Sequence, residues 1–349
     1  MSFGESHGAA IGCVVDGCLP NIELDESIIQ KDLARRKPGQ SAMTTPRAEN
    51  DACKILSGVY KGKTLGTPIA VVVENLDQHS DDYNDFADKY RPSHADYTYD
   101  AKFGFRDPRG GGRSSARETI ARVIAGSIAK KCLGDSVEIR AWVESVHSIS
   151  MPFAENIPSI EDVESSPMRC PHKATSEKMV EFIKKIKSEG ESVGGVIHCK
   201  ISGIRVGLGE PSFDKLSAEL AKAMMSIPAV KGFEIGAGFA SARLFGSLNN
   251  DSFYAENGKV KTRTNNAGGI LGGISSGQTI DFKVAFKPTA TITKEQTTID
   301  KNLNETKIIG KGRHDPCVLP RAVPIVEAMA AIVLFDFALI QNSRTNFSI

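Results

Sequence analysis

The stretch that decides the fold class is IDFKVAF at residues 280–286, where every second residue is apolar. This period of two is typical of a strand with one buried face. The same alternation occurs in three earlier segments, at 137–143, 197–201 and 233–239. A continuous apolar run at 69–73 predicts another strand, buried on both of its faces.

Apolar residues at helical spacing predict five helices among these strands. They cover approximately 28–37, 120–128, 179–190, 216–227 and 324–337, with Pro324 in the first helical position of the last one. Because the strands outnumber the helices and often follow one another, we expect an α+β fold with antiparallel sheets. We expect one domain over residues 1–349, with a less regular surface excursion near 151–175.

The composition excludes several classes of protein. The chain has 349 residues, a net charge of +1 and 40% hydrophobic residues, which is typical of an ordinary globular protein rather than a disordered one. Its longest apolar run, residues 328–335, is too short for a membrane helix. Seven cysteines without a C-x-x-C pair, and no signal peptide after Met1, predict free thiols in the cytoplasm.

Positive charge is concentrated in three windows despite the near-neutral total. Residues 31–47, 102–117 and 311–321 together carry a net charge of +10. Their glycines, prolines and serines favour loops that converge on an anion, although most charge runs are only solvated surface.

The sequence RGGGRSSARE at 109–118 is the first candidate binding motif. A glycine run before a helix lets backbone N–H groups approach an anion, and arginines can donate two hydrogen bonds to a phosphate or carboxylate. Ser115 and Glu118 also fit a capping box, so the serines could serve only to start the helix.

Three loops contain histidine in a setting that suits acid–base chemistry. They are GESHG at 4–8, RPSHAD at 91–96 and GRHDPC at 312–317. The alternatives are loop histidines without a task, an Asx-turn at Asp315 and a buried, unreactive Cys317. The segment 236–241 lacks the spacing and the acidic residue of a dinucleotide-binding fingerprint.

Taken together, these motifs resemble the chorismate synthase family. GESHG at 4–8, GRSSARET at 112–119 and GRHDPC at 312–317 are similar to its three signatures. Segments 91–99, 208–211, 266–273 and 287–289 also fit, in order, so the resemblance covers essentially the whole chain. It implies a layered β-α-β sandwich, with central helices between antiparallel sheets, and a homotetramer.

The resemblance implies a lyase of the shikimate pathway. Members of the family convert 5-enolpyruvylshikimate 3-phosphate to chorismate and phosphate by 1,4-elimination, the last common step of aromatic amino-acid biosynthesis. They require reduced FMN without net redox change, and some use NADPH to reduce it. The implied partners are small molecules, not nucleic acid or a membrane.

The resemblance also implies roles for individual residues. His7 would act as an acid near the phosphate or flavin, His94 would protonate reduced flavin, and Asp315 would remove the substrate proton with flavin N5. Ser6 and Ser115 would support this relay. Contacts to FMN would come from Arg113, Ser114, Ser115, Ala229, Gly272, Lys287, Pro288, Thr289, Ala290, Thr291 and Arg313. Contacts to the substrate would come from Arg36, Arg47, Arg109 and Arg117, with Arg36 and Arg47 facing NADPH in members that reduce their own flavin.

The chain departs from the family pattern in four places. Members usually begin about ten residues earlier, with a strand before GESHG, and we expect the edge of the site or an oligomer contact to change accordingly. Ala42 stands where many members have Arg, Pro228 where Asn or Gln is common, and Asn266 where His is common.

Two other classes of function remain as alternatives. A phosphate-ligand binding protein without catalysis would not need His7, His94 and Asp315 together. A nucleic-acid-binding protein is disfavoured by the near-neutral charge and by an aromatic content of 7%.

Overall fold

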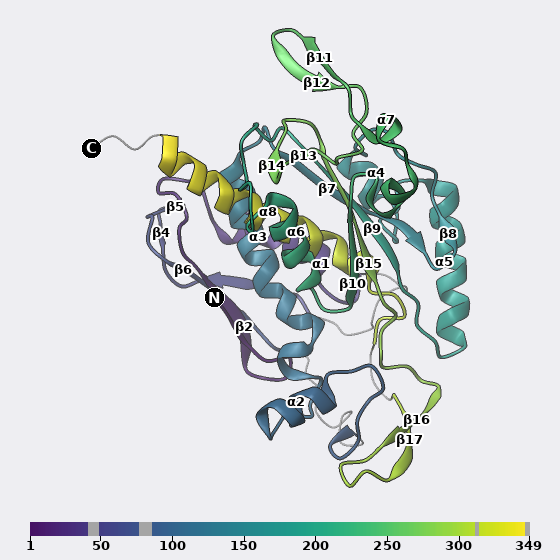
Figure 1. Ribbon diagram of the computed structural model, residues 1–349. Coiled ribbons are helices and arrows are strands. Elements are labelled where there is room, and N and C mark those ends of the chain that lie inside the picture. The colour runs from purple at the N-terminus through teal and green to yellow at the C-terminus, as the bar shows by residue number, and fades with distance from the viewer. Residues whose placement is uncertain (41–48, 77–85, 311–313, 346–349) are drawn as a thin grey trace.

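Two antiparallel sheets form the main body of the computed structural model (Figure 1), which describes residues 1–40, 49–76, 86–310 and 314–345. The four-stranded sheet has the order β1-β2-β6-β3, formed by Ser2–Gly4, Ala10–Val15, Ile69–Glu74 and Cys53–Ile55. The five-stranded sheet has the order β10-β15-β9-β7-β8, formed by Val230–Ile235, Ile280–Phe286, Gly195–Ser202, Glu138–Val146 and Ile149–Ser150.

Strand β15 is the heptapeptide that predicted the fold class. It pairs with β9 in a register that places Phe282 opposite Cys199 and Val284 opposite Ile197. These four side chains are buried. The alternation therefore predicted both the strand and its inward face, and the α+β class is confirmed.

Four helices pack against these sheets. They are α1 (Glu26–Arg36), α3 (Thr119–Leu133), α6 (Leu216–Met225) and α8 (Leu319–Thr345). Helix α3 packs on β2, whereas α8 packs on β7 and β9, and α3 and α8 pack on each other. The buried apolar side chains of the helices and both sheets form one connected cluster.

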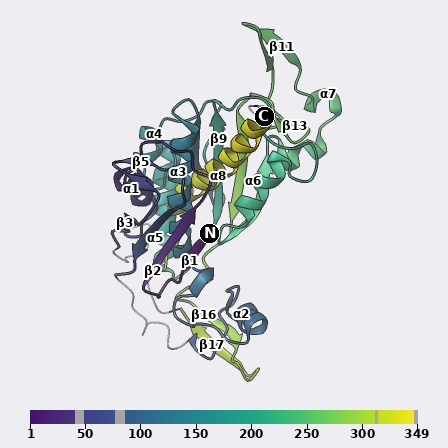
Figure 2. The same cartoon turned by 90° about the vertical axis from the view of Figure 1, so that its left-hand side faces the viewer.

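The remaining elements lie around this body. The helices are α2 (Asp96–Phe103), α4 (Ile160–Glu164), α5 (Lys173–Ser188) and α7 (Gly246–Asn249), and 3-10 turns occur at Gly112–Ser114, Ala116–Glu118 and Gly238–Arg243. The small hairpins are β4–β5 (Val59–Tyr60, Lys63–Thr64), β11–β12 (Phe253–Glu256, Lys259–Thr262), β13–β14 (Ile270–Leu271, Ile274–Ser275) and β16–β17 (Glu295–Ile299, Glu305–Ile309). Figure 2 shows β11–β12 projecting at one end of the molecule and β16–β17 beside α2 at the other.

Three details of the sequence interpretation are wrong. Strand β6 is fully buried only on the face of Ile69, Val71 and Val73, because its sheet packs on helices on one side. Strand β10 ends at Ile235, where Gly236 takes a positive φ and a 3-10 turn follows. Helix α8 begins at Leu319, so Pro324 lies inside the helix rather than at its start.

The structure compensates for Pro324 with a side chain from a distant segment. A proline inside a helix cannot donate to the carbonyl four residues earlier. That carbonyl belongs to Pro320, and it accepts a hydrogen bond from the buried guanidinium of Arg169 instead. Arg169 lies in the stretch 151–175, which also buries Val163, Met168 and Cys170 and is therefore anchored to the body.

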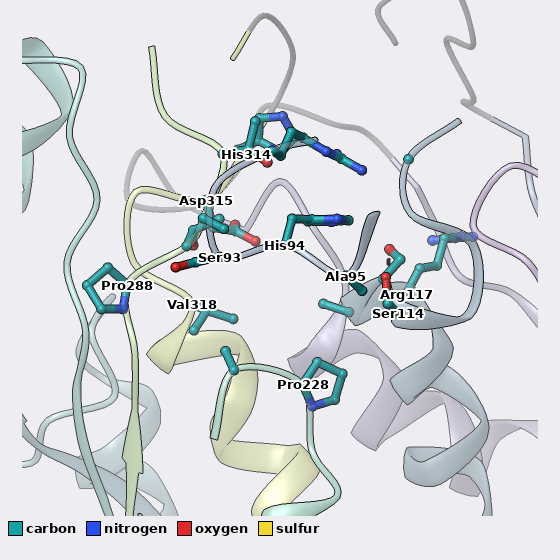
Figure 3. A pocket seen from close by; sticks show the side chains of 18 of the residues that line it. Ser93, His94, Ala95, Ser114, Arg117, Pro228, Pro288, His314, Asp315 and Val318 are labelled. Atoms are coloured by element: carbon teal, nitrogen blue, oxygen red, sulfur yellow. Dashed lines mark hydrogen bonds between the residues drawn. The ribbon is translucent and has the colours of Figure 1, made fainter. Parts of the chain in front are cut away.

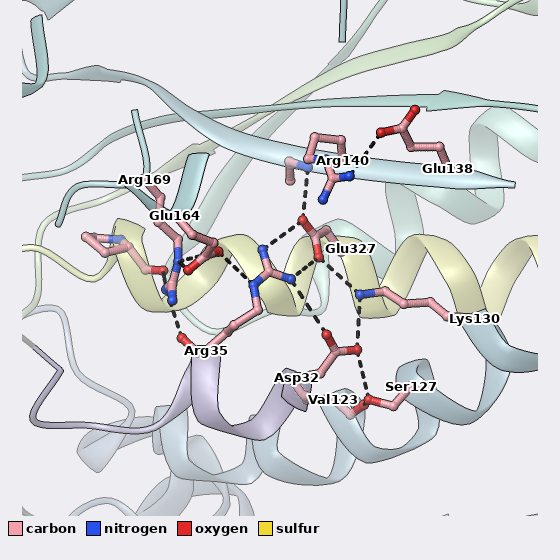
Figure 4. Close-up of polar contacts among 12 residues, drawn as sticks. Asp32, Arg35, Val123, Ser127, Lys130, Glu138, Arg140, Glu164, Arg169 and Glu327 are labelled. Atoms are coloured by element: carbon pink, nitrogen blue, oxygen red, sulfur yellow. Dashed lines mark hydrogen bonds and ion pairs between the residues drawn. The ribbon is translucent and has the colours of Figure 1, made fainter. Parts of the chain in front are cut away.

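A buried ion-pair network connects the helices (Figure 4). Glu327 of α8 accepts from both terminal nitrogens of Arg35 at 2.5 and 3.1 Å, from Lys130 at 3.1 Å and from the backbone N–H of Ala141 at 3.2 Å. Burial by itself would raise the pKa of Glu327, but Arg35 and Lys130 hold this pKa well below its usual range. The network thus fixes α1, α3, α8 and β7 beneath the loops described next.

Helix α8 is long and apolar enough to cross a membrane, although no such helix was expected from the sequence. More than half of its most apolar window, 56%, is buried inside the protein. Such burial is typical of a core helix.

Candidate active site

A cavity of about 330 Å³ lies where loops from both halves of the chain meet (Figure 3). Its volume is within the range of small-molecule sites. Its walls are Pro38 and His7, Arg91 with residues 93–95, Gly110 with residues 114–117, residues 228–229, residues 287–291, and His314, Asp315, Val318 and Arg321. Each of the three histidine loops of the sequence therefore contributes to one cavity.

His7 is fixed by its neighbours on two sides. Its ring lies 3.0 Å from Ser6 Oγ through Nδ1, and both side chains are buried. Gly110, with φ of +66°, faces the same ring, and a Cβ there would lie 2.2 Å from His7 Nδ1. The glycine run therefore allows close contact between the backbone and the imidazole.

His94 is held by a buried carboxylate. Its Nδ1 lies 2.9 Å from Oδ1 of Asp96, which is itself bound by Arg91 at 2.7 and 2.8 Å. Burial lowers the pKa of His94, although the hydrogen bond to Asp96 opposes this effect. Because the carboxylate accepts from Nδ1–H, the neutral ring keeps Nε2 as an acceptor. The ring lies between Asp315 and Ala95 in the view of Figure 3.

Asp315 lines the cavity from the loop that leads into α8. Its carboxylate forms an ion pair with Arg321, in the first turn of α8. Arg321 also donates from Nε to the backbone oxygen of Arg36 at 3.2 Å. The nearby Cys317 is buried, and burial raises its pKa to about 12, as expected for an unreactive thiol.

Lys287 is the cation that faces the cavity without a carboxylate partner among the described residues. Its ammonium group donates to the carbonyl oxygen of Ser93 at 2.7 Å. Burial, followed by repulsion from Lys231, lowers the pKa of Lys287. An anion placed beside this ammonium group would offset both effects.

Two arginines expected to contact substrate are bound to the protein's own acids. Arg36 and Arg117 share the buried Asp51, at 3.2 and 3.0 Å, and Arg117 also pairs with Glu49. Arg117 still borders the cavity, whereas Arg36 donates to Thr119 Oγ1 and to the carbonyl oxygen of Ala116. The positive charge of the first two windows is thus partly neutralised by carboxylates from outside them.

The structure brings most of the remaining predicted residues to the cavity. Ser114, Ser115, Ala229, Pro288, Thr289, Ala290 and Thr291 line it. Ser115 accepts from the N–H of Arg117 at 3.3 Å, while Glu118 binds Arg122, so the reciprocal capping box is not formed.

Besides Ser6 and Arg36, three predicted residues of the described chain lie away from the cavity lining. Arg113 donates to Gly4 O at 2.9 Å and to Ser2 Oγ at 2.6 Å, and thus holds the short strand β1 that precedes Glu5. Arg109 is half exposed and pairs with Asp107, and Gly272 lies in the β13–β14 turn. Arg47, Arg313 and Ala42 lie outside the described residues.

Sequence reasoning missed one partner of a predicted site residue. Asp96, which orients His94, stands two residues after it in RPSHAD, and this spacing was the available signal. Arg321, the ion-pair partner of Asp315, stands six residues after it at the end of the third basic window, where positive charge close to Asp315 was expected. Pro228 lines the cavity, while Asn266 donates to the carbonyls of Leu248 and Asn249.

Comparison with known proteins identifies the family of this chain. The family model for chorismate synthase matches residues 1–339. Curated chorismate synthases from Opitutus terrae and Cytophaga hutchinsonii are 56% identical over 345 residues and 57% identical over 340 residues. These alignments cover 98% and 97% of this chain, and 95% and 94% of the two relatives.

A solved structure supports the same assignment. It is described as the crystal structure of chorismate synthase, has a TM-score of 0.77 and 32% identity to this chain, and the match covers 98% of this chain and 91% of the other. The chain therefore belongs to the chorismate synthase family, and it is a lyase.

Proposed function

We propose that the cavity binds 5-enolpyruvylshikimate 3-phosphate together with reduced FMN and releases chorismate and phosphate by 1,4-elimination. Family membership supports the overall conversion. The observation that carries the proposal is that His7, His94 and Asp315, from three distant segments, line one cavity with Lys287, which pairs with no carboxylate of the described residues. Such an arrangement joins proton-transfer groups to an anion site.

The side chains present fit an anionic flavin. Ser114, Ser115 and the segment 287–291 line the cavity, and they supply hydroxyl groups and an ammonium group suited to a phosphate. Gly110 lies close to the His7 ring, and because it is a glycine, no side chain projects into the cavity at this position. Reduced FMN, when bound, would lend electron density to the substrate and recover it, so that the reaction has no net redox change.

The two histidines and the aspartate have separate proposed tasks. His7, supported by Ser6, would donate a proton near the leaving phosphate. His94 would hold one proton at Nδ1 against Asp96 and exchange another at Nε2 with a bound ligand. Asp315, positioned by Arg321, would accept the proton removed from substrate carbon.

Arginines would act mainly by fixing the walls of the cavity. Arg117 borders the cavity while it binds Asp51 and Glu49, and Arg321 does so while it binds Asp315. Arg36 connects these two regions. Its guanidinium group pairs with Asp51, and its backbone oxygen accepts a hydrogen bond from Arg321. Lys287 is therefore the described cation most suited to direct contact with a ligand phosphate.

Titration of FMN fluorescence with and without the substrate tests the shared cavity. Two ligands that order the same loops should each raise the affinity for the other. We expect FMN to bind more tightly when 5-enolpyruvylshikimate 3-phosphate is present. Equal affinities in the two titrations would contradict a common site.

Further properties of the family also belong to this proposal. The packing of α3 on β2 and of α8 on β7 and β9 supports the layered β-α-β sandwich. All seven cysteines are free thiols, which supports a cytoplasmic enzyme. A homotetramer, and NADPH as the reductant of the flavin, follow from the resemblance alone and stay predictions.

A further inference from the structure

Cys18 and Cys132 are in contact although 114 residues separate them in sequence. Their Sγ atoms lie 3.6 Å apart. Cys18 follows β2 in the loop that leads to α1, and Cys132 is next to the last residue of α3. Formation of a disulfide would require the sulfurs to approach by only about 1.5 Å more.

The loop that carries Cys18 is fixed in this position. Thr64 Oγ1 donates to the carbonyl oxygen of Leu19 at 2.6 Å and accepts from the N–H of Ile22 at 2.9 Å. Thr64 therefore clamps the chain immediately after Cys18. The contact between the two thiols is part of an ordered structure on both sides.

The Cys18 thiol differs chemically from the others. The hydrogen bond from Cys132 lowers the pKa of Cys18 to about 7 although burial opposes this effect, and the same contact raises the pKa of Cys132. Burial raises the pKa of Cys13 and Cys53 to about 11. Cys18 thus has the largest thiolate fraction of these thiols near neutral pH, and the thiolate is the reactive form.

Small oxidants can reach this pair. Cys18 lines a cavity of about 820 Å³ whose other walls include Ile128 and Ala129 of α3 and Leu339 and Ile340 of α8. This cavity shares none of its lining residues with the candidate active site. Hydrogen peroxide is far smaller than the cavity.

We propose that Cys18 and Cys132 form a reversible disulfide when the protein meets a peroxide. The Cys18 thiolate attacks one peroxide oxygen, the O–O bond breaks, and Cys18 sulfenic acid and hydroxide form. The Cys132 thiol then attacks the Cys18 sulfur, and the S–S bond forms as the sulfenic oxygen leaves as water. Overall two thiols lose two electrons and two protons, and one peroxide becomes two waters.

The position of the disulfide links it to the active-site scaffold. Helix α3 begins directly after the segment 110–118, of which Gly110 and residues 114–117 line the candidate active site. A covalent bond at the other end of α3 would join this helix to the loop before α1. The cross-link would therefore restrain α3 and α1 relative to each other.

Thiol counting and peptide mass spectrometry of the full chain after peroxide treatment test the proposal. Protein exposed to a small excess of hydrogen peroxide is alkylated, denatured and digested. We expect two of the seven thiols to be lost, a Cys18–Cys132 cross-linked peptide to appear, and dithiothreitol to restore both thiols. The rate of formation should fall when the pH is lowered from 8 to 6 because the Cys18 thiolate is lost.

Cys132→Ser and Cys53→Ser serve as a matched pair of controls. Cys132→Ser should give no cross-link and should instead accumulate sulfenic acid on Cys18. Cys53→Ser, which changes another partly buried thiol whose sulfur points to the Glu26 carbonyl, should form the cross-link at the wild-type rate. The proposal is overturned if wild-type protein loses no thiols, or if the cross-linked peptide joins other cysteines.

Discussion

The guanidinium group of Arg321, in the first turn of α8, forms an ion pair with the carboxylate of Asp315, in the loop before this helix. The same guanidinium donates from Nε to the backbone oxygen of Arg36 at 3.2 Å, so Asp315 is tied through it to α1. Arg35, the residue before Arg36 in α1, binds the buried Glu327 of α8. The orientation of this carboxylate in the cavity therefore depends on the packing of two helices rather than on its own loop alone.

Replacement of Asp315 by Asn tests its chemical role. Asn can still accept a hydrogen bond from Arg321 and can form the same turn, but it cannot take up a proton. We expect fold and FMN binding to persist while chorismate formation falls by roughly a hundredfold or more, the usual scale for a positioned acid–base group. Steady-state turnover and thermal melting are the measurements. Near-normal turnover would leave Asp315 a structural residue.

A double-mutant cycle tests whether Arg321 acts through Asp315. Arg321→Lys keeps the charge but loses the planar fork that serves both Asp315 and Arg36. We expect it to reduce turnover by roughly tenfold, and to reduce it much less when Asp315 is already Asn. The turnover rates of the two single variants and of the double variant give the coupling free energy between Arg321 and Asp315. Strictly additive effects would mean that Arg321 works independently of Asp315.

Gly110→Ala tests the close approach of the backbone to His7. The new Cβ would lie 2.2 Å from the His7 ring, so the imidazole would have to move. Gly104 also has a positive φ, +73° against +66°, but a Cβ there meets nothing within 4 Å. We expect both variants to lose similar backbone stability and only Gly110→Ala to lose most activity. Similar activities, compared by turnover and melting temperature, would argue against a role for the His7 position.

Lys287→Met tests the anion site. This side chain lines the cavity and has no carboxylate partner among the described residues. Loss of a charged hydrogen bond should weaken substrate binding roughly tenfold or more, as measured by calorimetry. Lys222→Met, which removes an exposed lysine paired with Glu219, is the control and should bind normally. Unchanged affinity for Lys287→Met would place the phosphate elsewhere.

Outside the cavity, the surroundings of His198 lead us to expect that the stability of the protein changes with pH. Its ring is buried between Asp281 at 2.6 Å and Glu144 at 2.9 Å, against Trp142, while Lys200 and Lys283 pair with the same acids. Burial opposes the charged ring, but the two carboxylates prevail and raise the pKa of His198.

Because the pKa of His198 is raised in the folded protein, its full contribution to stability is present below the unfolded pKa of about 6.5. This contribution is lost as the pH rises through the folded pKa. We therefore expect His198→Gln to lower the free energy of unfolding, measured with urea, by roughly 3 kcal/mol at pH 6 and by less at pH 9. A loss that is constant over this range would show that His198 does not titrate there.

The periodicity of apolar residues predicted the strands and helices well, because burial of one face of an element imposes this period on its sequence. The strand at 280–286 and the helix from 120 follow from residues that contact the core directly. The start of α8 was missed because a proline normally stands near a helix start, and only the distant Arg169 satisfies the carbonyl that Pro324 leaves unpaired. No local pattern contains that information.

The site was predictable as a set of motifs but not as a geometry. His7, His94 and Asp315 stand in loops that the sequence marked, and all three line the cavity. The functions of the arginines were not separable from sequence, because Arg36 and Arg117 bind Asp51 across loop segments whose contacts exist only in the folded chain. Counting charge along the sequence cannot show which charges are already paired.

The most direct test of the proposed function is anaerobic turnover with chemically reduced FMN. Purified protein is mixed with 5-enolpyruvylshikimate 3-phosphate and reduced FMN, and chorismate absorbance and released phosphate are recorded together. We predict that both products form in equal amounts, and that neither forms when FMN is left out or kept oxidised. Chorismate formed at the same rate without reduced FMN, or none formed in its presence, would contradict the account.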